Sequence, residues 1–392
     1  MNTLMQIGPL WTFLLSMHRR RPRDTLLMGA GFAIATAALA VMLAIPAGID
    51  RIAGRTGQPD IALALSNGAL DEAGSSLSPE QVALVSHLPH VERDASGRPL
   101  VAPQFLANAK LSRIDGQTTS VLMRGISADT WAIIEPARIN VPVKPREGAR
   151  EMAASATLAA QFPELGRSHV DIQGSSWQRI GEFSAAGNLW ESEIWTDLSA
   201  LQAAYNRAGR VSSVWLKLDS PEVLPALRAA ATDDPRLQGV RILGQIEYYE
   251  QQVGFLTQLA RSAALGVSLL LGAGAILATS TTLGMVLERR RKEMATLRAL
   301  GFSDTAVGTA LLLDLLAIGA LASSTTFGIV HVFLDGASFG TSSVNQAVYA
   351  RFVVDAEVMT AVLGYALLVG LASAAMPLRK VMSGRLVDAL RE

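Results

Sequence analysis

Four long apolar segments constrain this chain more than any other feature of its sequence. Uncharged stretches of about 20 residues are long enough to cross a bilayer as helices. The sequence contains three such stretches and a fourth interrupted only by Asp314, and they fall at residues 25–49, 262–287, 358–378 and 305–334. Half of all residues are hydrophobic and only 17% are charged, whereas about a quarter are charged in a typical soluble domain. The sequence therefore predicts a membrane protein with four transmembrane α-helices.

The positions of the basic residues predict how the chain runs through the membrane. Lys and Arg gather before the first span, between the second and third spans and after the fourth, whereas the loop between the last two spans has only Arg351. Cytoplasmic loops carry such an excess of Lys and Arg. We therefore expect both termini in the cytoplasm of a bacterium and the chain in its inner membrane. The expected cytoplasmic segments are residues 1–24, 288–304 and 379–392, and the expected periplasmic segments are residues 50–258 and 335–357.

The N-terminal segment allows two interpretations. Residues 1–24 are apolar on one side and end in basic residues, which fits an amphipathic helix at the cytoplasmic membrane interface. Alternatively, the segment is a leader that only orients the first span, because chain termini are often mobile. Cleavage as a signal peptide is disfavoured, since the apolar run that follows is longer than the about 7–15 residues of a signal sequence.

Residues 50–258 have the pattern of a large extracytoplasmic α+β domain. Runs with β-strand character occur at residues 60–65, 119–126, 168–173 and 211–218. Sequences rich in helix formers lie between these runs. Strands that alternate with helices over about 200 residues predict an α+β or α/β domain.

The same domain carries helix starts, a candidate boundary and a stalk. Ser-Pro-Glu sequences at Ser78 and Ser220 are typical of helix N-termini. A Gly- and Pro-rich stretch at residues 141–150 indicates a boundary between two lobes. The helical pattern from residue 247 onward predicts one helix that runs from the domain, as a stalk to residue 261, into the second span.

The sequence contains no recognisable catalytic or metal-binding motif. It has no cysteine, no Gly-x-Ser-x-Gly and no His-Glu-x-x-His, so thiol, serine-hydrolase and zinc-protease chemistry have no support. His87 and His90 are separated by a proline, which favours a surface turn over a metal site. Trp177, Trp190 and Trp195 favour core packing, with a protein-contact surface as the alternative. We predict no cofactor or metal, and the zero net charge gives no reason to expect a nucleic acid partner.

The segment between the second and third spans, LERRRKEMATLRALGFSDT, is charged and has a helical pattern. Met294, Leu297 and Leu300 recur every three residues on one face of that helix. A membrane anchor needs only Lys and Arg, yet this segment adds an apolar face and places Glu293 within its basic run. We therefore favour a docking element for another protein over a plain positive-inside anchor.

A turn should return this segment to the membrane. Gly301 can adopt the left-handed conformation that ends a helix. Ser303 is placed to cap the next helix, and Asp304 is favourable in its first turn.

At this point the sequence resembles the FtsX-like (MacB-type) permeases of ABC transporters. The loop after the second span in that family is similar to the sequence RRKEMATLRALGF, which begins here at Arg290. The order of basic start, single span, large extracytoplasmic domain and three further spans is also similar. The C-terminal PLRKVMSGRLVDALRE matches the closing motif of the family at Pro377, Arg379, Ala389, Leu390 and Arg391. Val387 stands where the family often has proline, and Lys380 and Val381 replace small residues.

The resemblance implies that the loop is a coupling helix seated in a groove of a separate cytoplasmic ABC ATPase, itself a dimer. It also implies a second permease chain, identical or a paralogue. An efflux or extraction machine can include a periplasmic adaptor as a further partner, and we expect the four spans to contact membrane lipids. The sequence has no Gly-x4-Gly-Lys-Ser/Thr motif, so we expect a non-ATPase subunit rather than an enzyme. The expected coupling residues are Arg290, Glu293, Met294, Leu297, Arg298, Leu300 and Gly301.

Two functions remain open under this resemblance. In the first, ATP-driven movements of the periplasmic domain drive efflux or extraction of a substrate from the envelope, by mechanotransmission rather than passage through the spans. In the second, the same movements activate an extracytoplasmic hydrolase, as the cell-division members of the family do. The large outer domain favours the first function.

Asp314 is the remaining polar residue of interest. It lies well inside the third span, where an unpaired carboxylate costs about 2.5–3.5 kcal/mol on insertion scales. We therefore expect Asp314 to face protein. A hydrogen bond between helices is the favoured role of Asp314, and proton transfer is the alternative. Proton transfer is disfavoured because it needs a second ionisable group, and His331, towards the other end of the span, is the only other one within the spans.

Overall fold

The computed structural model divides the chain into two compact units. The helical unit comprises residues 1–47, 258–337 and 352–392, and the α/β unit comprises residues 48–257 and 338–351. Within these units, the structure describes residues 6, 8–11, 22–289, 296–297, 300–342 and 347–383.

Four helices are long and apolar enough to cross a membrane. They are α2 (Pro22–Thr56), α8 (Gln245–Arg289), α10 (Asp304–Leu334) and α11 (Ala356–Ser383). The four predicted apolar helices are thus confirmed, and so is the single helix expected to lead into the second span, which is α8. The last residues of α2 and the first residues of α8 belong to the α/β unit.

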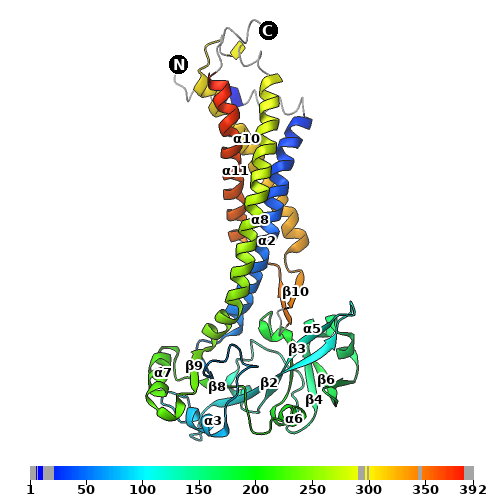
Figure 1. Ribbon diagram of the computed structural model, residues 1–392, viewed down its shortest axis with the longest axis vertical. Coiled ribbons are helices and arrows are strands. Elements are labelled where there is room, and N and C mark those ends of the chain that lie inside the picture. Colours follow the sequence, from blue (N-terminus) through cyan, green and yellow to red (C-terminus); the bar gives the residue numbers. More distant parts are fainter. Residues whose placement is uncertain are drawn as a thin grey trace. The chain divides into compact units, whose positions relative to one another are not determined.

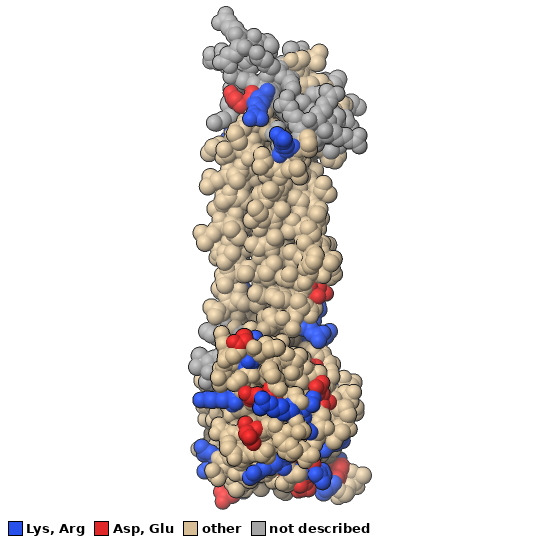
Figure 2. Space-filling view, turned by 90° about the vertical axis from the view of Figure 1, so that its right-hand side faces the viewer, with Lys and Arg blue, Asp and Glu red and all other residues tan. Residues whose placement is uncertain are grey.

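The helical unit packs through apolar and small side chains. Its four long helices lie side by side in Figure 1 and share one hydrophobic cluster. Each of them contributes buried residues to this cluster, among them Phe32 of α2, Ala275 of α8, Leu311 of α10 and Val369 of α11. On the face shown in Figure 2, the middle of this unit presents no Lys, Arg, Asp or Glu. Such an uncharged surface is what helices in contact with lipid require.

The α/β unit, which includes the predicted domain between the first and second spans, is built on one mixed nine-stranded sheet. Its strand order is β5-β6-β4-β7-β3-β2-β8-β1-β9. The pairs β3–β7 and β4–β6 are parallel and the other pairs are antiparallel. The strands are β1 (Ile61–Ser66), β2 (Val101–Ser112), β3 (Thr118–Ile126), β4 (Glu151–Ser155), β5 (His169–Ile172), β6 (Ser175–Phe183), β7 (Glu193–Asp197), β8 (Ser213–Lys217) and β9 (Val240–Gly244).

Short helices pack against this sheet and complete two hydrophobic clusters. The α-helices are α3 (Pro79–Ser86), α4 (Thr130–Ile133), α5 (Ala156–Gln161), α6 (Leu198–Ala204) and α7 (Leu224–Asp233). The 3-10 helices are η1 (Pro163–Gly166), η2 (Leu189–Ser192), η3 (Pro221–Val223) and η4 (Pro235–Leu237). Trp177, Trp190 and Trp195 are fully buried, so the core interpretation of the tryptophans is confirmed.

Most of the local predictions for this unit are confirmed, but one is wrong. Each of the four predicted strands is present, and Ser78 caps α3 in a capping box with Gln81. The predicted boundary at residues 141–150 is wrong, because β4 follows it directly and joins the same continuous sheet. The helix expected from Ser220 is present, with Ser220 as the N-cap residue of η3. It continues as α7 from Leu224, where Pro225 fits the first turn because it lacks an N–H.

The segment predicted as a short loop between the third and fourth spans contains a β-hairpin. Strands β10 (Ser338–Ser342) and β11 (Ala347–Arg351) pair antiparallel, with Ser338 opposite Arg351. This hairpin belongs to the α/β unit, although its two flanks belong to the helical unit. The chain therefore enters the α/β unit twice.

Candidate functional site: the elbow and the stalk root

The elbow, residues 290–303, connects α8 to α10. Leu297 is half-buried and packs against the apolar cluster of the helical unit, whereas Leu300 is 72% exposed. The predicted apolar face is therefore divided between an internal contact and a side chain that points outward. The other residues of the predicted coupling helix, Arg290, Glu293, Met294 and Arg298, lie outside the described residues.

The turn at the end of the elbow has the predicted geometry. Gly301 has a φ of +93°, the left-handed conformation that L-residues with a Cβ rarely adopt. The amide of Phe302 donates to the carbonyl of Leu297 at 3.2 Å. Ser303 then caps α10, because its hydroxyl accepts from the amide of Ala306 at 3.2 Å. The helix stop and the N-cap are both confirmed.

A residue from the N-terminus completes this cap. The side-chain oxygen of Gln6 accepts hydrogen bonds from Ser303, at 3.0 Å from its amide nitrogen and 3.2 Å from its hydroxyl. Gln6 and Leu10 are each only 3% exposed, and Leu10 belongs to the cluster of the helical unit. The described residues Gln6 and Leu10 of the N-terminal segment thus pack within the helical unit, and the choice between the two interpretations of residues 1–24 stays a prediction.

Asp314 faces protein, as expected. Its side chain is 7% exposed, between the buried Leu311 and Leu315 of α10. Burial removes the carboxylate from lipid, where it would be costly. Its role as a structural hydrogen-bonding group, with proton transfer as the alternative, stays a prediction.

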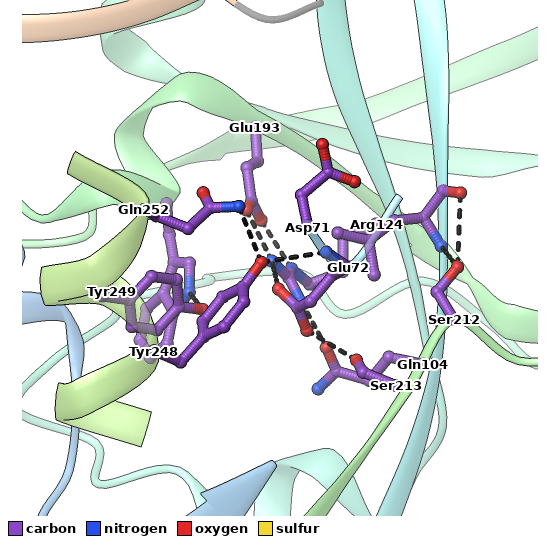
Figure 3. Close-up of polar contacts among 12 residues, drawn as sticks. Asp71, Glu72, Gln104, Arg124, Glu193, Ser212, Ser213, Tyr248, Tyr249 and Gln252 are labelled. Atoms are coloured by element: carbon purple, nitrogen blue, oxygen red, sulfur yellow. Dashed lines mark hydrogen bonds and ion pairs between the residues drawn. The ribbon is translucent and has the colours of Figure 1, made fainter. Parts of the chain in front are cut away.

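The stalk root is the place where α2 ends and α8 begins, at residues 55–58 and 245–252. Beside it lies a buried ionic cluster centred on Arg124 of β3, which is 1% exposed (Figure 3). The Arg124 guanidinium binds Glu193 through two hydrogen bonds of 2.7 Å. It also binds Glu72 at 3.0 and 3.2 Å and Gln104 at 2.5 Å. All five N–H donors of the guanidinium therefore have acceptors.

The excess negative charge of this cluster is offset by further donors. Glu193 accepts from the indole N–H of Trp195 at 2.9 Å. Glu72 accepts from the hydroxyl of Ser213 at 2.5 Å and from the indole N–H of Trp215 at 3.4 Å. Burial alone would lower the pKa of Arg124, but the charges of Glu193 and Glu72 outweigh it and raise that pKa well above its usual value. The guanidinium and both carboxylates of the cluster are consequently hydrogen-bonded in a site that is closed to water.

The first turns of α8 are tied directly to this cluster. The Tyr248 hydroxyl accepts from the backbone amide of Glu72 at 2.9 Å and from the side chain of Gln252 at 2.8 Å. The Tyr249 hydroxyl accepts from the indole N–H of Trp190 at 3.1 Å. Both tyrosines are 3% exposed, and burial raises the pKa of each hydroxyl. They remain neutral hydrogen-bonding groups at physiological pH.

The end of α2 is joined to the start of α8 at the same place. Arg138 donates to the carbonyls of Arg55 and Gly57 at 2.9 and 2.8 Å, which satisfies carbonyls left open at a helix C-terminus. The backbone amide of Gln58 donates to the side chain of Gln245 at 2.8 Å. A Cβ added to Gly57 would lie 2.5 Å from the Cα of Ile246. The two helices therefore meet at backbone distance, which only glycine allows here.

This arrangement is a buried structural cluster. The charged groups are inaccessible to a substrate, and the described residues include no cluster of three or more His, Asp or Glu that could hold a metal ion. His87 and His90 are exposed, as the surface-turn interpretation requires. What the site can do is hold the two helix ends rigidly against the centre of the sheet.

Comparison with known proteins identifies the C-terminal region of the chain. Residues 265–385 match the family described as FtsX-like permease, C-terminal. This part of the chain is an FtsX-like permease domain. The matched region runs from within α8 through the elbow and α10 into α11. A search of curated proteins finds no match.

Two crystal structures are similar to part of this chain. One is the extracellular domain of the noncanonic ABC-type transporter YknZ from Gram-positive bacteria, with 13% identity and a TM-score of 0.34. The other is the periplasmic region of MacB from Actinobacillus actinomycetemcomitans, with 12% identity and a TM-score of 0.35. The similarity covers 47% and 49% of the permease, and 99% and 91% of the two solved chains, respectively.

The stalk root of the permease was not predicted from the sequence, although one signal was present. Arg124 stands in the middle of an apolar run, VLMRGI, which is expected to form a buried strand. A buried arginine requires acidic partners. The sequence does not say which of the many acidic residues supply them.

Proposed function

We propose that this permease transmits movement, driven by ATP hydrolysis in a separate ABC ATPase, from the elbow through α8 to the α/β unit. One observation carries the proposal. α8 is a single uninterrupted helix of 45 residues, with its first turns bonded into the stalk root and its last residue, Arg289, next to the elbow. At 1.5 Å per residue this helix is roughly 68 Å long, more than twice the about 30 Å of a bilayer core.

The stalk root is suited to pass such a movement on. Its hydrogen bonds join the tyrosines of α8 to Glu72 and Trp190. Arg124 of β3 in turn pairs with Glu72 and with Glu193 of β7. A buried joint with many hydrogen bonds deforms little. A displacement of α8 is therefore more easily absorbed by rearrangement of the whole α/β unit than by bending at the root.

In this proposal the elbow receives the ATPase. Leu300 presents an exposed apolar side chain directly before the Gly301 turn. Basic residues and Glu293 precede it in the sequence. The elbow and both termini are cytoplasmic, and the α/β unit is periplasmic. The working unit contains two permease chains and two ATPases, with an adaptor where the substrate is exported.

Export or extraction of a substrate is the proposed outcome of the movement, and activation of a hydrolase is the alternative. Both outcomes use the same transmission. They differ in what binds the α/β unit, an adaptor in the first case and a hydrolase in the second.

The test uses the full chain in lipid nanodiscs with the ABC ATPase that co-purifies with it. Amide hydrogen exchange in the α/β unit is compared with and without ATP. We expect ATP to change exchange at the stalk root. Leu300→Asp should abolish both the association with the ATPase and the ATP-dependent change, because a carboxylate replaces the exposed apolar contact.

Leu300→Asp is a sharper test than Leu297→Asp, since the half-buried Leu297 also supports the fold of the helical unit. A second test variant is the charge-reversing Glu293→Arg, which leaves both leucines in place and should also weaken the association with the ATPase. Retention of the ATPase and of the ATP-dependent change by both Leu300→Asp and Glu293→Arg would remove the elbow from the mechanism.

A further inference from the structure

The short helix η2 is bonded to both stalk helices. The backbone amide of Leu189 donates to the hydroxyl of Thr56, at the end of α2, at 2.8 Å. The indole N–H of Trp190 donates to the hydroxyl of Tyr249, near the start of α8, at 3.1 Å. Two adjacent residues of η2 thus contact the ends of two helices that are separated by almost 200 residues in sequence.

The same helix is bonded to the hairpin between the third and fourth spans. The backbone amide of Tyr349 in β11 donates to the hydroxyl of Ser192 at 3.0 Å. Tyr349 is 5% exposed and belongs to the main cluster of the α/β unit. Its ring meets that of Phe162 edge-on, with centroids 6.4 Å apart. The hairpin is therefore anchored in a hydrophobic core through Tyr349 of β11.

The base of the hairpin is also held closely. A Cβ added to Gly48 of α2 would lie 2.1 Å from the backbone oxygen of Arg351, the last residue of β11. In the helical unit, the chain just after the hairpin is fixed as well. The amide of Val353 donates to the carbonyl of Ala44 at 3.2 Å, and His331 bonds the carbonyl of Val354 at 2.9 Å.

η2 continues directly into β7, a strand in the middle of the sheet. The first residue of β7 is Glu193, which forms the bidentate pair with Arg124. In the sheet, β7 lies between β4 and β3. Because η2 and β7 are consecutive in the chain, a displacement of η2 would directly move a central strand of the sheet.

We infer that η2 is a junction at which three segments act on the α/β unit: the end of α2, the start of α8 and the β10–β11 hairpin. The hairpin makes α10 and α11 a third input, with Tyr349 and Ser192 as its positioning residues. This inference rests on the proposed transmission and extends it to the last two spans, which have no other covalent connection to the α/β unit.

The experiment uses the full chain and its ATPase in nanodiscs, with two readouts. Amide exchange of residues 347–351 without nucleotide reports hairpin docking. The difference in exchange at β7 between the nucleotide-free state and the state with a non-hydrolysable ATP analogue reports transmission. Tyr349→Ala should speed hairpin exchange roughly tenfold or more, about the effect of losing 1.4 kcal/mol of local stability. It should also reduce, without abolishing, the ATP-dependent difference at β7.

Three matched variants complete the design. Tyr349→Phe keeps the ring in the core and should behave as wild type in both readouts. Ser192→Ala removes the acceptor for the Tyr349 amide and should resemble Tyr349→Ala. Tyr205→Ala removes an aromatic ring that packs on the same cluster but lies outside the hairpin, and it should leave the difference at β7 unchanged.

The outcomes separate this inference from the proposed function. If the hairpin undocks in Tyr349→Ala while the β7 difference stays at the wild-type value, the third input is wrong and the proposed function stands. An equal loss in Tyr205→Ala would likewise overturn the inference, because the effect would then come from a weakened core. If the wild-type chain shows no ATP-dependent difference at β7, both proposals fail.

Discussion

The stalk root and the elbow lie at the two ends of α8, and they differ in how far the chain completes them. At the root, every donor of Arg124 has an acceptor, and Trp190, Trp195 and Trp215 close the cluster from water. At the elbow, Leu300 points outward and the cap of α10 depends on Gln6 from a distant segment. The start of α8 is therefore held by partners within the same chain. The elbow at its other end exposes apolar surface, which we propose another protein covers.

The largest expected effect comes from breaking the ionic cluster at the root. Arg124→Leu leaves Glu72 and Glu193 buried together without a cation, and removal of one partner from a buried pair typically costs about 3–5 kcal/mol. We expect a lower unfolding midpoint for the α/β unit in the full chain. Tryptophan fluorescence can measure it, because Trp190, Trp195 and Trp215 surround the cluster.

The matched control is Arg98→Leu. Arg98 pairs with Asp94 at 3.0 Å, but its side chain is 77% exposed, and surface pairs contribute only about 0–1 kcal/mol. An equal loss of stability in Arg98→Leu and Arg124→Leu would contradict the special role of the buried cluster.

A smaller effect is expected where the two stalk helices meet. Gly57→Ala places a Cβ 2.5 Å from the Cα of Ile246, and overpacking of this kind costs about 1–3 kcal/mol. The backbone must separate locally, so amide exchange should rise in the first turn of α8. Gly54→Ala is the control in the same helix, because a Cβ at Gly54 meets nothing within 4 Å. Unaltered exchange in Gly57→Ala would show that the helices do not approach at this point.

Local chemistry explains why much of the fold could be predicted. Apolar length defined the four long helices, and the Ser78 and Ser303 caps followed from residues within one turn of each helix start. Gly301 was recognisable because a left-handed residue before a cap favours glycine. Each of these features depends on neighbours in sequence, so a single chain contains the necessary information.

The features that were missed depend on distant partners. Arg124 signals a buried charge, but its acceptors Glu72 and Glu193 are brought to it only by the order of strands in the sheet. Strand β10, with sequence SFGTS, has too few β-branched or aromatic residues to be recognised, and it forms because β11 inserts Tyr349 into a core built elsewhere. The elbow was found from its motif, whereas the internal contact of Leu297 was not.

The smallest expected effect concerns the elbow and sharpens the contrast with the root. Gln6→Ala removes the acceptor of the Ser303 amide, and a lost hydrogen bond at a half-buried group costs about 0.5–1.5 kcal/mol. Amide exchange should rise at the first turn of α10 and remain unchanged at the stalk root. Gln6→Glu keeps the acceptor and adds a negative charge near a helix N-terminus, which is favourable, so it should protect the turn at least as well as glutamine. If Gln6→Ala leaves the Ser303 amide as protected as in wild type, the N-terminal segment does not brace the elbow, and the cap of α10 is complete without it.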